Sequence, residues 1–450
     1  MRKPAMTFSL RHAVRLVLTG CLVCVTPAYA EAPFIVGIST HLMNYEHPLR
    51  APLDLSAQAG FNAVKDDIFW STAAPTPYQW RIPPQWRNYL TIAKERDMSR
   101  LAILGYSTYF HDNQKPRTPK VRTAFLNYVD YVTRMLGNRV SYYEIWNEWD
   151  LEASGDRQLA LDYVKLVQKT VPIIRKNTRN VAGPPAKILA GSVTPDGMRF
   201  GFADPLIESG ALDLVDGLSV HPYAHCSAND GNTPEAWVRW MADYERHIRT
   251  KAGRDVPIYL TEMGWPSHQG PCGNSETTQA LYMARIYLLA RTVPNVKGMW
   301  WFDLYNDGPD RYDQEHNFGL LNEDLSPKPA YTMMKAIAPV VRDFTYDASA
   351  SSLTDTLYQL HFNKGSERVL VAWAIGQPRD VQVVSQGPLK GPVRMIDTVH
   401  AERGEVGEVG SAQSWSCQGD RCSASIKLTH FPKIIRLSPQ RSGKHLARKE

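Results

Sequence analysis

Eight short apolar runs alternate with longer segments of helical periodicity between residues 34 and 341. The apolar runs are Phe34–Thr40, Ala63–Trp70, Leu101–Ser107, Tyr142–Trp149, Lys187–Val193, Leu214–Tyr223, Pro257–Trp265 and Val296–Tyr305. Helical patterns fall at 49–59, 85–98, 118–137, 156–178, 234–252, 275–293 and 328–341. Strands buried on both faces and separated by helices form parallel sheets. Eight such alternations predict an α/β fold, a (β/α)8 TIM barrel.

An open, doubly wound sheet is the alternative fold for this alternation. Such a sheet usually carries a Gly-rich turn after its first strand. Here residues 39–42 read Ser-Thr-His-Leu, which favours the barrel.

The character of the chain changes after about residue 343. Short strand-like runs follow one another there, separated by Gly, Pro, Asp and Asn, a pattern typical of an antiparallel β-sandwich. We therefore expect a signal peptide over residues 1–30, the barrel over 31–342, a β-sandwich domain over 343–438 and a basic, flexible tail over 439–450.

Residues 1–30 have the three parts of a secretory signal. A basic segment from Arg2 to Arg15 precedes an apolar run, Leu16–Val25, and residues 28–30 read Ala-Tyr-Ala. We expect a Sec signal cleaved after Ala30, and hence a periplasmic or secreted protein. The apolar run is shorter than the roughly 20 residues that span a bilayer, so the mature chain is expected to have no transmembrane helix. Leu18–Cys21 also resembles a lipoprotein cleavage box, which leaves lipidation open.

The charge balance argues against nucleic acid as a partner. The chain has 51 Lys and Arg against 45 Asp and Glu. Four of the basic residues lie in the signal segment, so 47 remain and the net charge is +2. No clustered basic face of the kind that nucleic acid requires is evident. We expect a monomer.

Four cysteines remain after the signal is removed: Cys226, Cys272, Cys417 and Cys422. Four cysteines allow three pairings. Cys417 and Cys422 are close in sequence, and Cys226 and Cys272 both follow predicted strand ends at one face of the barrel. We predict bonds 226–272 and 417–422, as suits an exported protein. A zinc site is the rival interpretation, but no C-x-x-C pair supports it.

Two of the predicted strands, the fourth and the seventh, end in a carboxylate flanked by tryptophan: Glu148 and Glu262. Barrel enzymes hold their catalytic groups at the carboxyl ends of the strands. Cleavage of a sugar acetal needs one carboxyl to protonate the leaving oxygen and a second to attack carbon or activate water. The pair therefore predicts glycosidic chemistry.

Three motifs carry a resemblance to a known family. Residues 145–148 (Ile-Trp-Asn-Glu), 220–223 (Val-His-Pro-Tyr) and 260–264 (Leu-Thr-Glu-Met-Gly) resemble the fourth-, sixth- and seventh-strand signatures of the retaining glycoside hydrolases of clan A. The resemblance is nearest to the family 39 type, which carries a β-sandwich beside the barrel and includes bacterial exopolysaccharide-cleaving members.

The resemblance implies a role for each motif residue. Glu148 would be the general acid/base, protonated when substrate arrives, and Glu262 the ionised nucleophile. Asn147 would bind the sugar 2-hydroxyl. Tyr223 would donate a hydrogen bond to Glu262, and His221 would line the same wall.

Other residues are candidates for substrate contact or for structure. Lys65 stands where this superfamily often has an arginine, and His41 ends the first strand, where it would either contact substrate or pack. Glu144 shares strand parity with Glu148 but lies deeper, so we expect a structural charge, with Lys65 as a possible partner.

Aromatic rings stack on sugar faces, and five tryptophans fall at predicted strand ends. Trp70, Trp149 and Trp301 are predicted substrate contacts, alongside Trp265 and Trp300. Tyr106, Tyr109, Phe110 and His111 follow the third strand and could extend the groove. An acidic loop follows the eighth strand, with Asp303, Asp307, Asp310 and Asp313. It would bind a cation or a basic sugar, or remain a solvated loop.

These observations predict a secreted retaining glycoside hydrolase that cleaves β-glycosidic bonds in a polysaccharide, acting internally on an exopolysaccharide. The alternative is a non-catalytic carbohydrate-binding barrel in an exopolysaccharide assembly. A metal-dependent hydrolase would show H-x-H or H-E-x-x-H, and a serine hydrolase G-x-S-x-G; neither pattern occurs. We expect neither a metal nor a cofactor.

Overall fold

The computed structural model describes residues 33–43, 48–179, 181–227, 232–387, 389–399 and 409–438. The predicted signal peptide, its cleavage site and the basic tail lie outside these residues. No helix in the described ranges combines the length and the apolar character needed to cross a bilayer.

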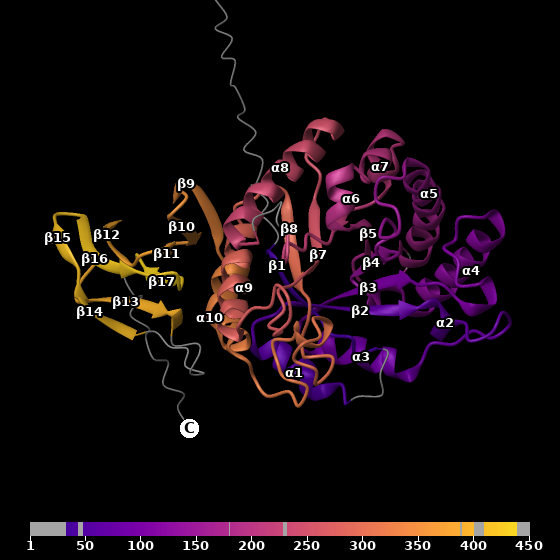
Figure 1. Ribbon diagram of the computed structural model, residues 1–450, viewed down its shortest axis with the longest axis horizontal. Helices are drawn as coiled ribbons and strands as arrows, with labels where there is room; N and C mark the ends of the chain where they lie inside the picture. Colours follow the sequence, from indigo (N-terminus) through magenta and orange to yellow (C-terminus); the bar gives the residue numbers. More distant parts are fainter. Residues whose placement is uncertain are drawn as a thin grey trace, which may run out of the picture. The chain divides into compact units, whose positions relative to one another are not determined.

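Eight parallel strands close into a barrel, with each strand paired to the next in sequence and the eighth paired to the first (Figure 1). The strands are β1 (Ile35–Ser39), β2 (Ala63–Phe69), β3 (Ser99–Gly105), β4 (Tyr142–Ile145), β5 (Lys187–Val193), β6 (Gly217–Val220), β7 (Ile258–Met263) and β8 (Val296–Trp301). The predicted (β/α)8 barrel is confirmed, and the open doubly wound sheet is excluded.

Helices follow the strands around the barrel. The longer ones are α1 (Arg50–Gln58), α3 (Pro84–Glu95), α4 (Pro119–Leu136), α5 (Arg157–Arg179), α8 (Pro234–Ala252), α9 (Glu276–Ala290) and α10 (Pro329–Asp343). Short helices α2 (Trp70–Ala73), α6 (Pro195–Phe200) and α7 (Asp204–Glu208) lie in the connections.

Side-chain caps explain where several helices begin. Thr118, Thr233 and Ser275 each accept a hydrogen bond from the backbone N–H three residues later, at the starts of α4, α8 and α9. A proline follows Thr118 and Thr233 at the first helical position. A hydroxyl cap satisfies a backbone donor that would otherwise lack a partner, and proline suits this position because its fixed φ is helical.

The lower part of the barrel interior is filled by side chains rather than open. Trp300 is completely buried there with Tyr142, Tyr259 and five aliphatic residues. A Cβ added at Gly37 would lie 2.3 Å from the Trp300 ring. Glycine at 37 therefore makes room for Trp300, and the packed floor confines any site to the upper end of the barrel.

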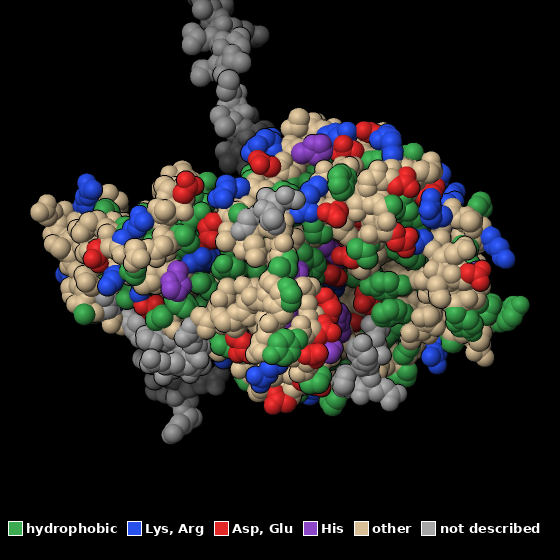
Figure 2. All heavy atoms as spheres, in the orientation of Figure 1, with side chains coloured by type: hydrophobic (Ala, Val, Ile, Leu, Met, Phe, Trp, Pro, Cys, Tyr) green, Lys and Arg blue, Asp and Glu red, His purple; other side chains and the backbone are tan. Residues whose placement is uncertain are grey.

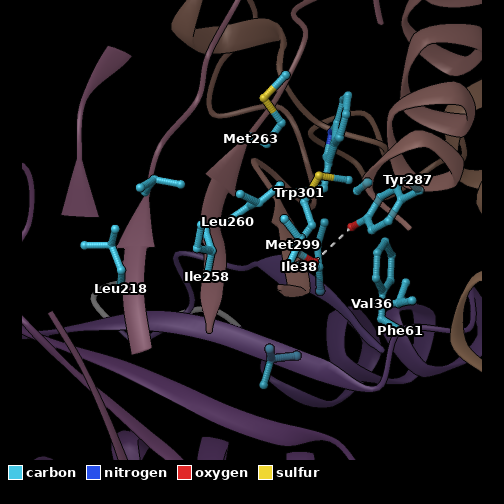
Figure 3. Packing of buried hydrophobic residues seen from close by; sticks show 14 of the residues in the cluster. Val36, Ile38, Phe61, Leu218, Ile258, Leu260, Met263, Tyr287, Met299 and Trp301 are labelled. Carbon is cyan, nitrogen blue, oxygen red and sulfur yellow. Dashed lines mark hydrogen bonds between the residues drawn. The ribbon is translucent and has the colours of Figure 1, made fainter. Parts of the chain in front are cut away.

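The outer face of the strands packs against the helices. Leu260, Met299 and Trp301 lie on this face, and the Tyr287 hydroxyl of α9 donates to the carbonyl oxygen of Met299 at 3.4 Å (Figure 3). Alternate residues of β8 thus face opposite ways, with Trp300 inward and Trp301 outward.

Several strands end earlier than the sequence predicted. The predicted fourth strand ran to Trp149, but β4 ends at Ile145, and Trp146 and Glu148 have φ of 67° and 45°. These left-handed conformations break the strand immediately after the barrel wall. Asn147 and Glu148 therefore project from a turn above β4.

The chain beyond α10 forms antiparallel sheets. A six-stranded sheet has the order β14-β13-β17-β11-β10-β9, and a three-stranded sheet the order β12-β16-β15. The strands are β9 (Thr345–Leu353), β10 (Leu357–Lys364), β11 (Glu367–Ala374), β12 (Arg379–Gln386), β13 (Pro392–Asp397), β14 (Val409–Ser414), β15 (Ser416–Gln418), β16 (Arg421–Leu428) and β17 (Lys433–Arg436). The predicted β-sandwich is confirmed.

Two disulfides join the four cysteines. Cys226 bonds Cys272 with Cα atoms 5.2 Å apart, and Cys417 bonds Cys422 with Cα atoms 4.0 Å apart. The first links the segment after β6 to the segment after β7. The second staples the β15–β16 hairpin.

Candidate active site

The turn after β4 presents Glu148 at the upper end of the barrel. Its backbone N–H donates to Ser192 Oγ at 3.2 Å, and its Oε1 lies 2.9 Å from His221 Nδ1. Ser192 Oγ also donates to Asn147 Oδ1 at 3.3 Å. Asn147 and Glu148 are both partly exposed, so these two neighbours remain open to a ligand.

Glu262 lies on β7, facing Glu148 across the mouth of the barrel. Its Oε1 accepts from Lys65 Nζ at 2.5 Å, and its Oε2 accepts from the Tyr223 hydroxyl at 3.1 Å. His221 Nδ1 is 3.4 Å from the same Oε2. Three donors from β2 and from the end of β6 therefore fix one carboxylate.

His221 connects the two glutamates. The ring is completely buried, and Nδ1 approaches an oxygen of both Glu148 and Glu262. Its Nε2 lies 3.0 Å from Ser192 Oγ. Burial would lower the pKa of His221, but the negative charge of Glu262 and the hydrogen bond to Glu148 outweigh it and raise the pKa. An imidazolium satisfies all these contacts, since both ring nitrogens then donate.

The electrostatics of Glu262 favour its charged form. Burial by itself would raise the pKa of Glu262, but the positive charges of His221 and Lys65 outweigh this and lower the pKa to about 2. Burial and the charge of Glu262 raise the pKa of the Tyr223 phenol well above its usual value. Tyr223 is therefore a donor and Glu262 an acceptor over the physiological range.

Glu144 lies below the site and is not part of it. The side chain is completely buried, and its Oε1 accepts from Thr261 Oγ1 at 2.8 Å. We expected Lys65 to be a candidate partner for Glu144; this was wrong, because Lys65 Nζ bonds Glu262 instead. Lys65 belongs to β2 and reaches the level of Glu262 because its long side chain extends upward inside the barrel.

The ends of β1 and β8 contribute a second group of polar residues. His41 Nδ1 lies 3.2 Å from Asp307 Oδ2 and 3.8 Å from Asp303 Oδ2. Asp303 is buried, whereas His41 and Asp307 are partly accessible. Asp310 and Asp313 of the same loop are exposed, and each accepts a hydrogen bond from a backbone N–H two residues later.

Two groups in the described ranges have ligand atoms close enough to hold a metal ion: Glu148 with His221 and Glu262, and His41 with Asp303 and Asp307. In each group the three atoms lie within 4.8 Å of one another. In the first group the histidine contacts both carboxylates directly, which accounts for the convergence without an ion.

The tryptophan predictions were wrong. Trp70, Trp149 and Trp301 are 0–1% exposed, as are Trp265 and Trp300. Trp70 begins α2 and packs against Phe110, Phe125 and Tyr128. Trp149 donates its Nε1–H to the Leu159 carbonyl at 3.0 Å. Trp300 fills the barrel interior and the other four rings are equally buried, so a sugar has no access to any of the five.

No family model matches this sequence, and no curated protein matches it. Solved structures do match. A family 39 glycoside hydrolase from the gut symbiont Bacteroides cellulosilyticus WH2 has a TM-score of 0.73 at 23% identity, over 90% of this chain and 81% of that one.

Two further structures have the same architecture. A GH30 endoxylanase from Clostridium papyrosolvens C71 has a TM-score of 0.61 at 12% identity, covering 91% of this chain and 97% of its own. A monomeric β-xylosidase from Caulobacter crescentus CB15 has a TM-score of 0.59 at 14% identity, covering 92% and 98%. The chain shares its fold with these enzymes.

Three residues near Glu148 and Glu262 were missed by the sequence analysis. Phe302 is partly exposed, with its ring centroid 5.1 Å from that of His41 and 6.3 Å from that of Tyr223. Asp67, on β2 two residues beyond Lys65, also points inward. Ser192 lies within a register irregularity of β5, between Ala190 and Val193. Alternate residues of a strand face the same side, so Trp300 points to Phe302 and Lys65 points to Asp67. No local signal in the sequence marks Ser192.

Proposed function

We propose that this chain is a secreted, retaining β-glycoside hydrolase that cleaves a polysaccharide by double displacement. Glu262 is the nucleophile and Glu148 the general acid/base. The observation that carries the proposal is the contrast between the two carboxylates. Glu262 is held ionised by Lys65, His221 and Tyr223, whereas the Glu148 carboxylate, within the described ranges, hydrogen-bonds only His221. The fold shared with glycoside hydrolases supports it.

The reaction has two steps. In the first, a Glu262 oxygen attacks the anomeric carbon, the glycosidic C–O bond breaks, and Glu148 gives its proton to the departing oxygen. In the second, Glu148 takes a proton from water, the water oxygen attacks the anomeric carbon, and Glu262 leaves. The sugar keeps its configuration because the carbon is inverted twice.

The spacing of the carboxylates favours retention over inversion. Retaining enzymes hold the two groups about 5–5.5 Å apart, whereas inverting enzymes leave about 6.5–9.5 Å for a water molecule. Here the nearest oxygens of Glu148 and Glu262 lie within 4.8 Å of one another. This separation supports the shorter spacing of retaining enzymes rather than the wider spacing of inverting ones.

Exposed tyrosines support a polymeric substrate. Tyr78, Tyr109 and Tyr312 are 92%, 63% and 70% exposed. They lie in the connections that follow β2, β3 and β8, on the same end of the barrel as the two glutamates. Rings in such positions stack on sugar faces beyond the cleavage point, which supports internal cleavage of a long chain. The two disulfides support export, since they persist in oxidising compartments.

The test is turnover of aryl β-glycosides and of bacterial and plant polysaccharides. We expect Glu262→Gln to lose on the order of 10^4-fold in kcat/KM or more, and Glu148→Gln to lose most activity on substrates with poor leaving groups. Glu323→Gln, an exposed carboxylate in the loop before α10, is the matched control and should equal wild type. Product analysis by NMR should show retained configuration.

A 2-deoxy-2-fluoroglycoside that inactivates the protein should attach to Glu262. Labelling of another residue would reassign the nucleophile, and inverted product would exclude double displacement. Tight binding to one polysaccharide with no turnover of any substrate would favour the non-catalytic carbohydrate-binding barrel.

A further inference from the structure

Two buried residues beneath the catalytic carboxylates have no place in the two-step reaction. Glu144 lies on β4, four positions before Glu148, and Thr261 precedes Glu262 on β7. Figure 2 shows acidic and histidine side chains gathered around a hollow over the barrel. Glu144 adds one more carboxylate below that group, where it is completely inaccessible to water.

The contacts of Glu144 do not account for its burial. Within the described ranges its one hydrogen bond comes from Thr261 Oγ1 at 2.8 Å, and its Oε2 has no partner. Burying a carboxylate is costly unless a cation or several donors compensate it. The charge that compensates Glu144 must therefore lie beyond Thr261.

The Thr261 hydroxyl connects Glu144 to His221. Thr261 Oγ1 lies 3.2 Å from His221 Nε2 and donates its single proton to Glu144 Oε1. The same oxygen can then only accept from His221, so Nε2 carries a proton. Because both contacts share one oxygen, the carboxylate and the imidazole lie within about 6 Å, where opposite charges stabilise each other.

The other neighbours of His221 require the same protonation. Ser192 Oγ lies 3.0 Å from Nε2 and donates its own proton to Asn147 Oδ1, so it accepts from the ring. At Nδ1 the acceptors are Glu148 Oε1 at 2.9 Å and Glu262 Oε2 at 3.4 Å. Both ring nitrogens face acceptors, and the ring that donates on both sides is the imidazolium.

Five charged groups are thereby connected: Glu144, Glu148, Glu262, Lys65 and His221. Before the first step Glu148 carries a proton, and the other two carboxylates balance the two cations. After that step Glu262 is an ester and Glu148 is ionised, so two carboxylates again balance two cations. Without Glu144 the group would have one excess positive charge in both states.

Other titratable groups face the same cleft or pack against Glu144. They are Asp66 and Asp67 of β2, Tyr106 after β3, Tyr163 of α5, Tyr223 after β6, His41 after β1, and Asp303, Asp307 and Glu315 after β8. Burial and the charge of Asp66 raise the pKa of Asp67 to about 7. Asp67 therefore titrates in the range of interest, and a test must read the charge of His221 directly.

We propose that Glu144 is a positioning residue for the glycosidase reaction. Through Thr261 it holds His221 as an imidazolium and balances the charge of that ring, so that Glu148 keeps the proton which the first step consumes. This inference rests on the proposed glycosidase function and deepens it. Glu144 touches no reacting group and acts only through Thr261 and His221.

The first experiment reads the charge of His221 by NMR of the full chain labelled with 15N in its histidine rings. The His221→Asn variant identifies the signal. We expect both ring nitrogens to be protonated at pH 7 in the wild type. In Glu144→Gln, which keeps the acceptor for Thr261 but not the charge, the midpoint of deprotonation should fall by about one unit. Thr261→Val should lower it as well, whereas Thr261→Ser should keep the wild-type midpoint.

The second experiment measures kcat/KM against pH with an aryl β-glycoside. In Glu144→Gln the alkaline limb should move to lower pH by about one unit, because the connected group loses a proton more readily without its third carboxylate. Glu245→Gln is the matched control. Glu245 is a buried carboxylate of α8 that accepts from Arg249 at 3.1 Å, and its loss should lower stability without moving the limb or the His221 signal.

A neutral His221 in the wild type at pH 7 overturns the inference while leaving the glycosidase proposal intact. So does a His221 midpoint that is unchanged in both Glu144→Gln and Thr261→Val, or a uniform loss of activity in Glu144→Gln with an unmoved alkaline limb. Absence of turnover on every substrate together with absence of labelling by a fluoroglycoside defeats the glycosidase proposal, and with it the role of Glu144 in catalysis, whatever charge His221 carries.

Discussion

Lys65 helps to hold Glu262, the proposed nucleophile, in its charged form. Its ammonium lies 2.5 Å from Glu262 Oε1; the Lys65 side chain is 3% exposed and that of Glu262 14%. A cation so close to a buried carboxylate stabilises the charged form more strongly than it would in water. The Lys65 ammonium contacts only Oε1 of Glu262, and Tyr223 and His221 contact Oε2.

Removing this charge should shift the acid side of the pH–activity profile. The pKa of Glu262 is about 2, so Glu262 stays ionised until the pH falls that far. In Lys65→Met the pKa should rise by about one to three units, and the acid limb of kcat/KM against pH should move up by the same amount. Lys65→Arg keeps the charge and should leave the limb near its wild-type position; an unmoved limb in Lys65→Met would show that His221 alone holds the charge.

Phe302 and Trp301 are adjacent, but the Phe302 ring lies beside His41 and Tyr223, whereas the Trp301 ring packs against the helices. Phe302→Ala should raise KM about 3- to 10-fold, the worth of one ring–sugar contact, with little change in Tm. Trp301→Ala should instead lower the free energy of unfolding by about 3–5 kcal/mol, because it empties a buried site between β8 and the helices. Steady-state kinetics and thermal unfolding of both variants check this; a larger KM effect in Trp301→Ala would contradict the assignment.

The Cys226–Cys272 bond joins the segments that follow β6 and β7, both of which border the site. It closes a loop with a sequence separation of 46, against 5 for Cys417–Cys422. Loop-closure entropy gives about 4 kcal/mol for the first bond and about 2 kcal/mol for the second. The Cys226→Ser/Cys272→Ser variant should therefore lose more stability than its Cys417→Ser/Cys422→Ser counterpart, measured by urea unfolding under non-reducing conditions.

A buried ion pair of the barrel helices also hydrogen-bonds two residues of the β-sandwich. Arg285 of α9 lies 3.2 Å from Glu235 of α8, and the same carboxylate oxygen accepts from Trp373 Nε1 of β11 at 3.1 Å. Arg285 also donates to the carbonyl of His430. Burial lowers the pKa of the guanidinium, and these acceptors compensate the buried charge.

Breaking this pair should destabilise the protein. Arg285→Met leaves Glu235 buried without its cation, which should cost about 3–5 kcal/mol of unfolding free energy. Arg246→Ala removes the exposed Asp243–Arg246 pair from the same α8 and should change stability by less than about 1 kcal/mol. The free energy of unfolding of both variants is measured by denaturant titration. Equal losses would mean that the Arg285–Glu235 pair does not stabilise the fold more than an exposed pair does.

The local sequence pattern was sufficient to predict the barrel, the order of its strands and the motif residues around Glu148 and Glu262. Hydrophobic periodicity reports burial directly, and a polar residue at the end of an apolar run marks a strand end without reference to the rest of the chain. The wrong predictions concern side chains whose direction changes if the strand position is shifted by one residue. Trp301 and Trp149 follow apolar runs just as the glutamates do, and nothing local distinguishes a ring that faces the cleft from one that faces a helix.

By itself, then, the sequence determined the (β/α)8 architecture, the sandwich and the two candidate carboxylates, because each is encoded in neighbouring residues. The tertiary structure decided the rest. It paired Lys65 with Glu262 rather than Glu144, across 197 positions of sequence, brought Ser192 beneath Glu148, and turned Phe302 instead of Trp301 toward the site. These outcomes depend on where each strand stops and on how far a side chain reaches across the barrel, which only the packing of all eight strands sets.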